Sequence, residues 1–463
     1  MADRKLKVLM LGWEFPPQIT GGLGTACEGL TRALAQHNLQ IHFFMPRLYG
    51  NESAPHLDLY DVTSGITQQG SRPGVRLKAH WLSDSEVTEH ENYEKMLVYD
   101  IPSFLSPYLR PEHKTLSEAE LRTIRSKSVR DFKTLISGEE IFSTTEEIVV
   151  PGAPSAKSGQ HYGQRLFEEV HAYAIRAVAL SRGLDFDVIH AHDWMTYLAG
   201  IAIGRASGKP VILHVHSLES DRSGIYKNET IAHIEESSLK VATAVMAVSH
   251  YTRRRVIDDY KIPESKVFTV HNGLSERTCI APTRTADDIF RVLFLGRVTF
   301  QKGPDYFVEA ALRTLKHLPN TQFILAGSGD MLEQLRQKIK KAGAEKNFLL
   351  PGFLRGHEVD EIFANSDLYV MPSVSEPFGL SALEALYYDI PIIVSRQSGV
   401  SEVIKHALKA DFWDVEELAD LIVGALKYPE LRRDLLQMAK QEVKRLDWNA
   451  SAKRVMEIYR TVT

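Results

Sequence analysis

The chain has 463 residues, more than one hydrophobic core usually holds, so two large domains are expected. With 44% hydrophobic and 25% charged residues and a formal charge of −4, it has no overall basic field for nucleic acid. No segment predicts a membrane span, and no signal peptide is recognisable. Its cysteines, Cys27 and Cys279, form no metal or disulfide pattern, so we expect a cytoplasmic protein.

Short apolar runs that predict strands alternate with longer helical patterns along the chain. The runs are Val8–Leu11, Ile41–Met45, Val188–Ala191, Val211–Val215, Ala244–Val248, Val267–Val270, Val292–Leu295, Phe323–Ala326, Leu368–Met371 and Ile390–Val394. Nearly continuous apolar strands, many followed by a loop and a helix, indicate parallel sheets covered on both faces. The alternation predicts an α/β protein.

A polar stretch from Ser275 to Asp288 predicts a linker, after which the pattern of strands and helices restarts. We therefore expect an N-terminal domain over residues 1–278 and a second domain over 289–445. The first carries an insertion at about residues 50–164. Such an insertion is often a lid or an acceptor-binding surface, and a decorated sheet edge explains it equally well.

The first glycine cluster, Thr20-Gly21-Gly22-Leu23-Gly24, follows the first predicted strand. Glycines at the start of a helix let backbone N–H groups approach a phosphate, which makes Gly22 a candidate ligand. The spacing is not that of the dinucleotide fingerprint, and a simple turn between strand and helix explains it equally well.

A pair of cations follows the strand Val292–Leu295, where ligands of open α/β sheets bind. Arg297 and Lys302 lie on this one loop. A guanidinium can fork onto two oxygens and an ammonium acts as a point charge, so the pair suits a diphosphate.

The segment from Glu376 to Glu384 reads Glu-Pro-Phe-Gly-Leu-Ser-Ala-Leu-Glu. A helix that begins near Gly379 points N–H groups and the positive end of its dipole at the preceding turn, which favours a phosphate. Carboxylates on either side can bind hydroxyl groups. The combination indicates a nucleotide sugar.

Histidines and other polar residues gather at the ends of strands. His190, His192 and His214 match no zinc spacing, and we interpret them as packed or hydrogen-bonded side chains. Better candidates for binding a sugar are Asp193, His216, Asn272 and the loop Glu219–Arg222.

The Gly-Arg-x4-Lys-Gly loop at 296–303 and the Glu-Pro-Phe-Gly-x4-Glu segment at 376–384 resemble the retaining GT-B glycosyltransferases of family 4, or group 1. That family includes glycogen and starch synthases. The resemblance implies two facing Rossmann-like domains with an interdomain cleft. It also implies a C-terminal helix, over 446–463, that crosses back to the N-terminal domain.

The resemblance also assigns roles to individual residues, with no metal and no other cofactor. The implied catalytic residues, which bind the leaving diphosphate or the transferred sugar, are His216, Arg297, Lys302 and Glu376. Further donor contacts are implied for Gly22, Asp193, Asn272, Phe378, Gly379, Leu380 and Glu384, the last of which would hold the ribose.

Trp13–Pro17 and His190–Trp194 are similar to glycogen synthases, which implies ADP-glucose or UDP-glucose as donor and the non-reducing end of an α-1,4-glucan as acceptor. Ile19, where the bacterial synthases have lysine, and Leu274-Ser275, where an aspartate usually follows Asn-Gly, leave donor and acceptor open. The alternatives are a retaining transferase acting on a small sugar, lipid or polysaccharide, a 2-epimerase with the same fold, a glycosidase, and a carbohydrate-binding relative.

Overall fold

The computed structural model describes residues 4–17, 22–48, 52, 54–62, 66–69, 72–76, 166–224, 226–274, 279–283 and 288–463. The expected insertion lies mostly outside these residues, as do Ile19 and parts of the first glycine cluster and of the linker. No helix in the described ranges is long and apolar enough to cross a membrane.

The chain separates into two compact units. Unit 1 comprises Met1–Val215, Tyr226–Met246 and Met456–Thr463, and unit 2 comprises His216–Ile225 and Ala247–Val455. The domain boundaries expected at residues 278 and 289 stay predictions.

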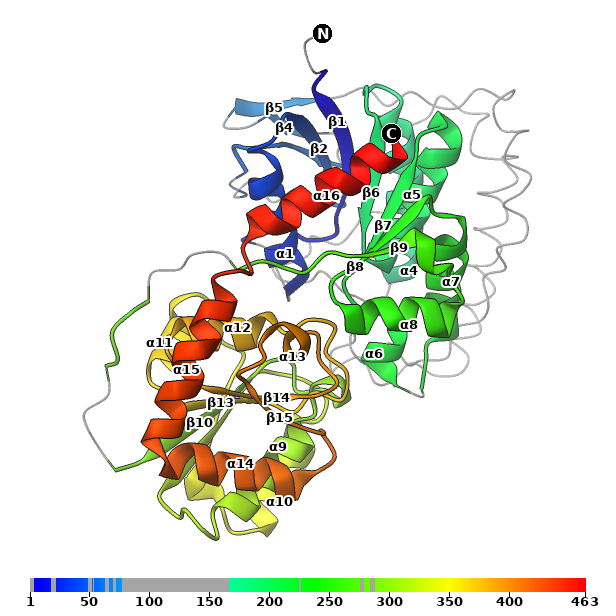
Figure 1. The fold of residues 1–463 in the computed structure, drawn as a ribbon. Helices are drawn as coiled ribbons and strands as arrows, with labels where there is room; N and C mark the ends of the chain where they lie inside the picture. Colours follow the sequence, from blue (N-terminus) through cyan, green and yellow to red (C-terminus); the bar gives the residue numbers. More distant parts are fainter. Residues whose placement is uncertain are drawn as a thin grey trace, which may run out of the picture. The chain divides into compact units, whose positions relative to one another are not determined.

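The first sheet has the strand order β5-β4-β3-β2-β1-β6-β7-β8-β9 (Figure 1). Its strands are β1 (Leu6–Leu11), β2 (Leu39–Met45), β3 (Asp58–Asp61), β4 (Ile66–Gln69), β5 (Arg72–Arg76), β6 (Val188–His192), β7 (Val211–Val215), β8 (Ala244–Ala247) and β9 (Val267–Thr269). Strand β1 pairs in parallel with β2 and β6, whereas β4 pairs antiparallel with β3 and β5. The core strands β6 and β7 are buried along their whole length, as their apolar runs predict.

The helices of this part of the chain are α1 (Gly22–Leu34), α4 (Leu166–Ser181), α5 (Trp194–Ser207), α6 (Glu219–Ser223), α7 (Glu229–Val241) and α8 (His250–Tyr260). Helix α5 is apolar around much of its circumference and is buried from Trp194 to Ile201, because it packs on β6 and β7 and also contacts α4 and α7.

The second sheet is parallel throughout, in the order β12-β11-β10-β13-β14-β15. Its strands are β10 (Phe290–Leu295), β11 (Thr321–Ala326), β12 (Phe348–Gly352), β13 (Leu368–Met371), β14 (Ile392–Ser395) and β15 (Leu408–Ala410). The helices are α9 (Pro304–Thr314), α10 (Leu332–Lys341), α11 (His357–Ala364), α12 (Leu380–Tyr387), α13 (Val400–Val403), α14 (Val415–Lys427) and α15 (Pro429–Val443).

The second sheet is apolar on both faces. Val292 and Phe294 of β10 join a cluster with α9 and α14, while Leu293 between them joins a cluster with α12. Successive side chains of a strand point to opposite faces, so β10 contributes to both clusters. The predicted α/β class is confirmed.

The chain ends in α16 (Trp448–Val462), whose last residues belong to unit 1. Tyr459 is fully buried, and its hydroxyl lies 2.7 Å from Nδ1 of His190 on β6. The end of the C-terminal helix therefore contacts β6 of the first sheet.

Candidate functional site

The cation loop leaves β10 and turns through a short 3-10 helix, Phe300–Lys302, before α9. Gly303 has a φ of 63° and precedes Pro304, the first residue of α9. A Cβ atom on Gly303 would lie 2.1 Å from the carbonyl oxygen of Pro372, so only glycine fits. This close approach brings the cation loop against the loop that follows β13.

Lys302 forms an ion pair with Glu376 across these two loops. Lys302 Nζ lies 2.5 Å from Glu376 Oε2, which also accepts a 3.2 Å hydrogen bond from Ser373 Oγ. The Glu376 side chain is 8% exposed and that of Lys302 is 22% exposed. Both groups were predicted site residues, and the structure brings them into direct contact.

Arg297 reaches the same loop through Gln301. Arg297 Nη2 donates to Gln301 Oε1 at 3.0 Å, and Gln301 Nε2 donates to the carbonyl oxygen of Ser375 at 3.2 Å. The amide of Val374 donates to the carbonyl oxygen of Gln301 at 3.0 Å. The residues from 297 to 302 are thus bonded to the segment that carries Glu376.

The backbone of Glu376 is held from its other side. Its N–H donates to the carbonyl oxygen of Gln397 at 2.9 Å, and its own carbonyl oxygen accepts from Gly399 at 2.9 Å. These bonds form an isolated parallel bridge between Glu376 and Ser398. The position of the carboxylate is therefore set by backbone hydrogen bonds as well as by Lys302.

Helix α12 begins at Leu380, directly after Gly379. Gly379 has a φ of 106°, and a Cβ atom there would lie 3.0 Å from Met371 Cε. Phe378 is 3% exposed and belongs to the apolar cluster under α12. Glu384 lies on α12 and is partly buried.

His216 and Asn272 also belong to unit 2. His216 follows β7 and is partly exposed, and burial lowers its pKa from 6.5 to about 3, so its imidazole is neutral at pH 7. Asn272 is 7% exposed. Next to it, a Cβ atom on Gly273 would lie 2.4 Å from the amide nitrogen of Trp448, which explains a glycine where the chain passes the start of α16.

Gly22 and Asp193 lie in unit 1. Gly22 is exposed as the first residue of α1. Asp193 is 6% exposed, precedes α5, and has a φ of 64°, a conformation that non-glycine residues rarely adopt. Burial and the charges of Glu14 and Asp193 raise the pKa of the Cys27 thiol. Glu14, fully buried, is a carboxylate near the predicted residues that the motif search did not single out.

The three histidines of the strand ends form a buried cluster in unit 1, called the histidine cluster below. The rings of His190 and His192 are stacked with centroids 4.3 Å apart, and His190 Nε2 lies 3.2 Å from His214 Nδ1. Tyr459 bonds the other nitrogen of His190. Packing and hydrogen bonding describe this cluster, as interpreted from the sequence.

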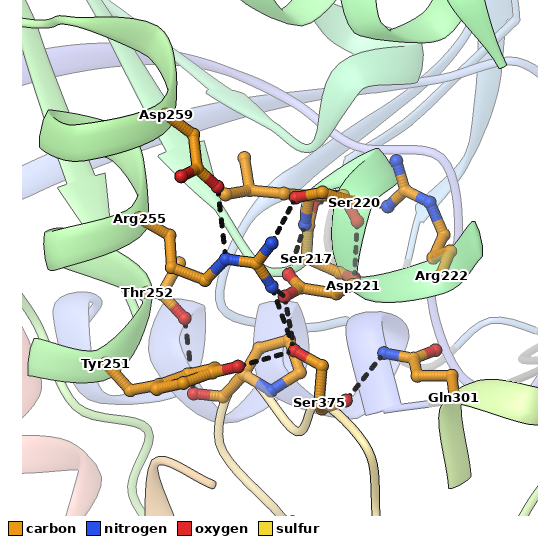
Figure 2. Close-up of polar contacts among 12 residues, drawn as sticks. Ser217, Ser220, Asp221, Arg222, Tyr251, Thr252, Arg255, Asp259, Gln301 and Ser375 are labelled. Carbon is orange, nitrogen blue, oxygen red and sulfur yellow. Dashed lines mark hydrogen bonds and ion pairs between the residues drawn. The ribbon is translucent and has the colours of Figure 1, made fainter. Parts of the chain in front are cut away.

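Motif reasoning did not identify Arg255 and Ser375. Figure 2 shows them with Asp221, in a network that ends on the loop carrying Glu376. The motifs gave no signal for it, because Arg255 and Ser375 lie 120 positions apart in the chain. The sequence predicts Asp221 only as part of the loop Glu219–Arg222, a candidate for binding a sugar.

Two family models match the chain. Residues 143–277 match Glycosyltransferase Family 4, and residues 277–442 match Glycosyl transferases group 1. An uncharacterised glycosyltransferase of Methanocaldococcus jannaschii is 31% identical over 475 residues, which cover 98% of both chains. A glycogen synthase of Mycobacterium tuberculosis is 21% identical over 98% of this chain and 94% of its own. An α-maltose-1-phosphate synthase of Mycolicibacterium smegmatis is 27% identical over 60% of this chain and 79% of its own.

Solved structures support the fold. A sucrose-phosphate synthase from Thermosynechococcus elongatus has a TM-score of 0.66 at 17% identity, over 98% of both chains. Anabaena HepE, solved in complex with UDP and glucose, has a TM-score of 0.60 at 14% identity, over 98% of this chain and 100% of its own. The chain is a glycosyltransferase enzyme with the GT-B fold, and it belongs to the group 1 glycosyltransferase family.

Proposed function

We propose that this enzyme transfers glucose, with retention of configuration, from ADP-glucose or UDP-glucose to the non-reducing end of an α-1,4-glucan. The observation that carries the proposal is the joining of both loop cations to one segment. Lys302 pairs with Glu376 at 2.5 Å, and Arg297 reaches the carbonyl of Ser375 through Gln301.

The chemistry follows from where charge develops. As the bond between C1 of the sugar and the diphosphate breaks, negative charge grows on the diphosphate, and preorganised cations stabilise it. C1 then bonds to an acceptor hydroxyl oxygen, whose proton leaves with the diphosphate. We assign the diphosphate to Arg297, Lys302 and the N–H groups of Gly379 and Leu380, and the sugar hydroxyls to Glu376 Oε1.

The remaining expected contacts belong to the same proposal. Glu384 would hold the ribose, the backbone of Phe378 would line the donor, and Gly22 would approach the phosphate. Asp193, His216 and Asn272 would contact the transferred sugar. Because two protein cations supply the positive charge, we propose that turnover needs no divalent metal, so EDTA should leave the rate unchanged. Since nucleotide sugars are cytoplasmic metabolites, the proposed site of action is the cytoplasm.

A second acceptor class has its own support. The names of the α-maltose-1-phosphate synthase and of the sucrose-phosphate synthase indicate products that are sugar phosphates. A sugar phosphate, such as glucose 1-phosphate, is therefore the second candidate acceptor.

The test is the release of nucleoside diphosphate from ADP-glucose, UDP-glucose, GDP-mannose and UDP-N-acetylglucosamine. Each donor is assayed alone, with glycogen, and with glucose 1-phosphate. Release from a glucose donor that glycogen stimulates supports the proposal, and stimulation by glucose 1-phosphate alone supports the second candidate. Conversion of a donor to its 2-epimer without an acceptor would overturn both.

A further inference from the structure

Two short helices of unit 2 carry a charged pair of side chains that contacts the loop carrying Glu376 (Figure 2). Asp221 lies on α6 and Arg255 on α8, and Arg255 Nη1 forms an ion pair with Asp221 Oδ1. Ser375 Oγ donates to the same oxygen of Asp221 at 2.6 Å, and it accepts from Arg255 Nη1 at 3.1 Å. We call these three residues the Ser375 clamp.

The clamp is buried. The Asp221 side chain is fully buried, and that of Arg255 is 23% exposed. The second oxygen of Asp221 accepts from the amide of Leu218 at 2.7 Å, which fixes the carboxylate on α6. Ser220 Oγ accepts from Arg255 Nη2 at 2.7 Å, and Asp259 accepts from Arg255 Nε at 3.2 Å. A planar guanidinium can bond all of these oxygens at once, which a lysine ammonium cannot do in the same geometry.

Other bonds hold the same loop from helix α8 and from the cation loop. The hydroxyl groups of Tyr251 and Ser375 lie 2.8 Å apart, and Thr252 Oγ1 donates to the carbonyl oxygen of Pro377 at 3.3 Å. On the opposite side Gln301 donates to the Ser375 carbonyl. Glu376 therefore sits between two residues, Ser375 and Pro377, that are both bonded to α8.

Helix α8 is itself hydrogen-bonded to α13, the helix that follows β14 of the second sheet. Glu402 on α13 accepts from the amides of His250 and Tyr251 at 2.6 and 3.0 Å, and it lies 2.8 Å from Nε2 of His271. A carboxylate at the start of a helix satisfies its unpaired N–H groups and complements its dipole. The bond to His271 and these amide bonds lower the pKa of Glu402 although burial opposes the shift.

We propose that the Ser375 clamp is a positioning device for the donor site. It holds Ser375 so that the next residue, Glu376, presents its carboxylate to Lys302 and to the sugar hydroxyls. The inference rests on the proposed function, because the clamp positions a donor-binding group only if Lys302 and Glu376 bind the donor. Asp221 and Arg255 touch no substrate in this proposal and act through Ser375.

The experiment measures kcat and the donor KM for four single variants of the full chain and for one double variant, which combines Ser375→Ala with Asp221→Asn. Ser375→Ala removes the hydroxyl and keeps the Asp221–Arg255 pair, so it tests the clamp with the least disturbance. Asp221→Asn removes the charge that orients the hydroxyl. Asp259→Asn is the matched control, since Asp259 bonds the far side of the same guanidinium. Lys302→Ala tests the donor site, and thermal unfolding confirms that each variant is folded.

Because a displacement of about 1 Å at a reacting group can cost on the order of 100-fold, Ser375→Ala and Asp221→Asn should each lower kcat by about 10- to 100-fold. The donor KM should change by less than about threefold. The double variant should lose no more than the worse single variant, because both changes remove one device. Asp259→Asn should retain kcat within about twofold of the original enzyme.

Two results overturn the inference while leaving the proposed function intact. One is a kcat within about twofold of the original in both Ser375→Ala and Asp221→Asn, while Lys302→Ala is inactive. The other is losses that multiply in the double variant, which would make the two residues independent. Full activity in Lys302→Ala would instead overturn the proposed donor site and the inference with it.

Discussion

Two buried polar clusters of the protein differ in the elements that their hydrogen bonds reach. The histidine cluster lies on β6 and β7, whereas the Ser375 clamp lies on α6, on α8 and on the loop after β13. The histidine cluster of unit 1 bonds Tyr459 of the last helix, and its rings stack on one another. The Ser375 clamp of unit 2 contains a formal ion pair and bonds the loop that carries Glu376. His214, in the first cluster, and His216, a candidate site residue, are only two positions apart in the chain.

The comparison shows that polar residues at a strand end are not functional by position alone. Their role follows from the element at the other end of their hydrogen bonds. A bond to a core helix stabilises the fold, whereas a bond to a loop of the site orients a reacting group. We therefore expect changes in the histidine cluster to lower stability and changes at the site loop to lower turnover.

The largest effect should come from the ion pair at the site. Lys302→Ala is expected to lower kcat by about 100- to 1,000-fold, because one charge that stabilises the leaving diphosphate is lost. The measurement is the release of nucleoside diphosphate from the preferred donor.

The matched control is Lys338→Ala, which breaks a second lysine–glutamate pair of 2.5 Å, to Glu309, on the partly exposed surface. Exposed pairs contribute about 0–1 kcal/mol, so this variant should keep its turnover and its unfolding temperature. Equal losses in both variants would contradict a specific role for Lys302.

A smaller effect, on stability alone, is expected at the histidine cluster. Tyr459→Phe removes the hydroxyl that bonds His190 and leaves a buried ring nitrogen without that partner. We expect the free energy of unfolding, measured by urea unfolding, to be about 1–3 kcal/mol lower than in the original protein. The kcat of the folded enzyme should be unchanged.

Tyr428→Phe is the control for this change, because Tyr428 is 61% exposed and its hydroxyl can bond water. A loss of kcat in Tyr459→Phe at full stability would erase the distinction drawn between the two clusters.

His216 gives a pH dependence whose sign can be worked out. Burial lowers its pKa in the folded protein to about 3, while the unfolded chain keeps a value near 6.5. Between these values the unfolded state binds more protons, so stability rises with pH through this window and falls as the pH drops from 6.5 towards 3. Well above pH 6.5 His216 is neutral in both the folded and the unfolded state, so its contribution to the pH dependence fades.

The measurement is urea unfolding at pH 7 and at pH 5 for the original protein and for His216→Gln. The variant should lose less stability between the two pH values. His357→Gln, at an exposed histidine whose side chain is 71% exposed, should behave like the original. An unchanged pH dependence in His216→Gln would show that His216 titrates normally.

The smallest effect concerns the two thiols. Cys27 is buried beside Glu14 and Asp193 in unit 1, and burial raises its pKa, whereas Cys279 is exposed. A thiol reagent at pH 8 should therefore modify one cysteine in the native protein and two in denaturant. Cys279→Ser should abolish the native reaction, and rapid modification of Cys27 would show that the region around Asp193 is open to solvent.

Much of the fold was predictable because its signals are local. Each of the ten predicted apolar runs overlaps a strand of the structure. The helix expected near Gly379 begins at Leu380, because the positive φ of Gly379 stops the helix from extending further back. Lys302 and Glu376 were both identified from motifs, since each lies in a short segment with a recognisable spacing.

What the sequence by itself determined was the alternation of strands and helices and the chemical types of the site residues, because periodicity and loop composition act over a few neighbouring positions. Only the tertiary structure decided which charges meet. Lys302 and Glu376 are 74 positions apart, and Ser375 and Asp221 are 154 apart. A hydrogen bond depends on ångström distances that are set when β10, β13 and the helices pack, so no local pattern carries that information.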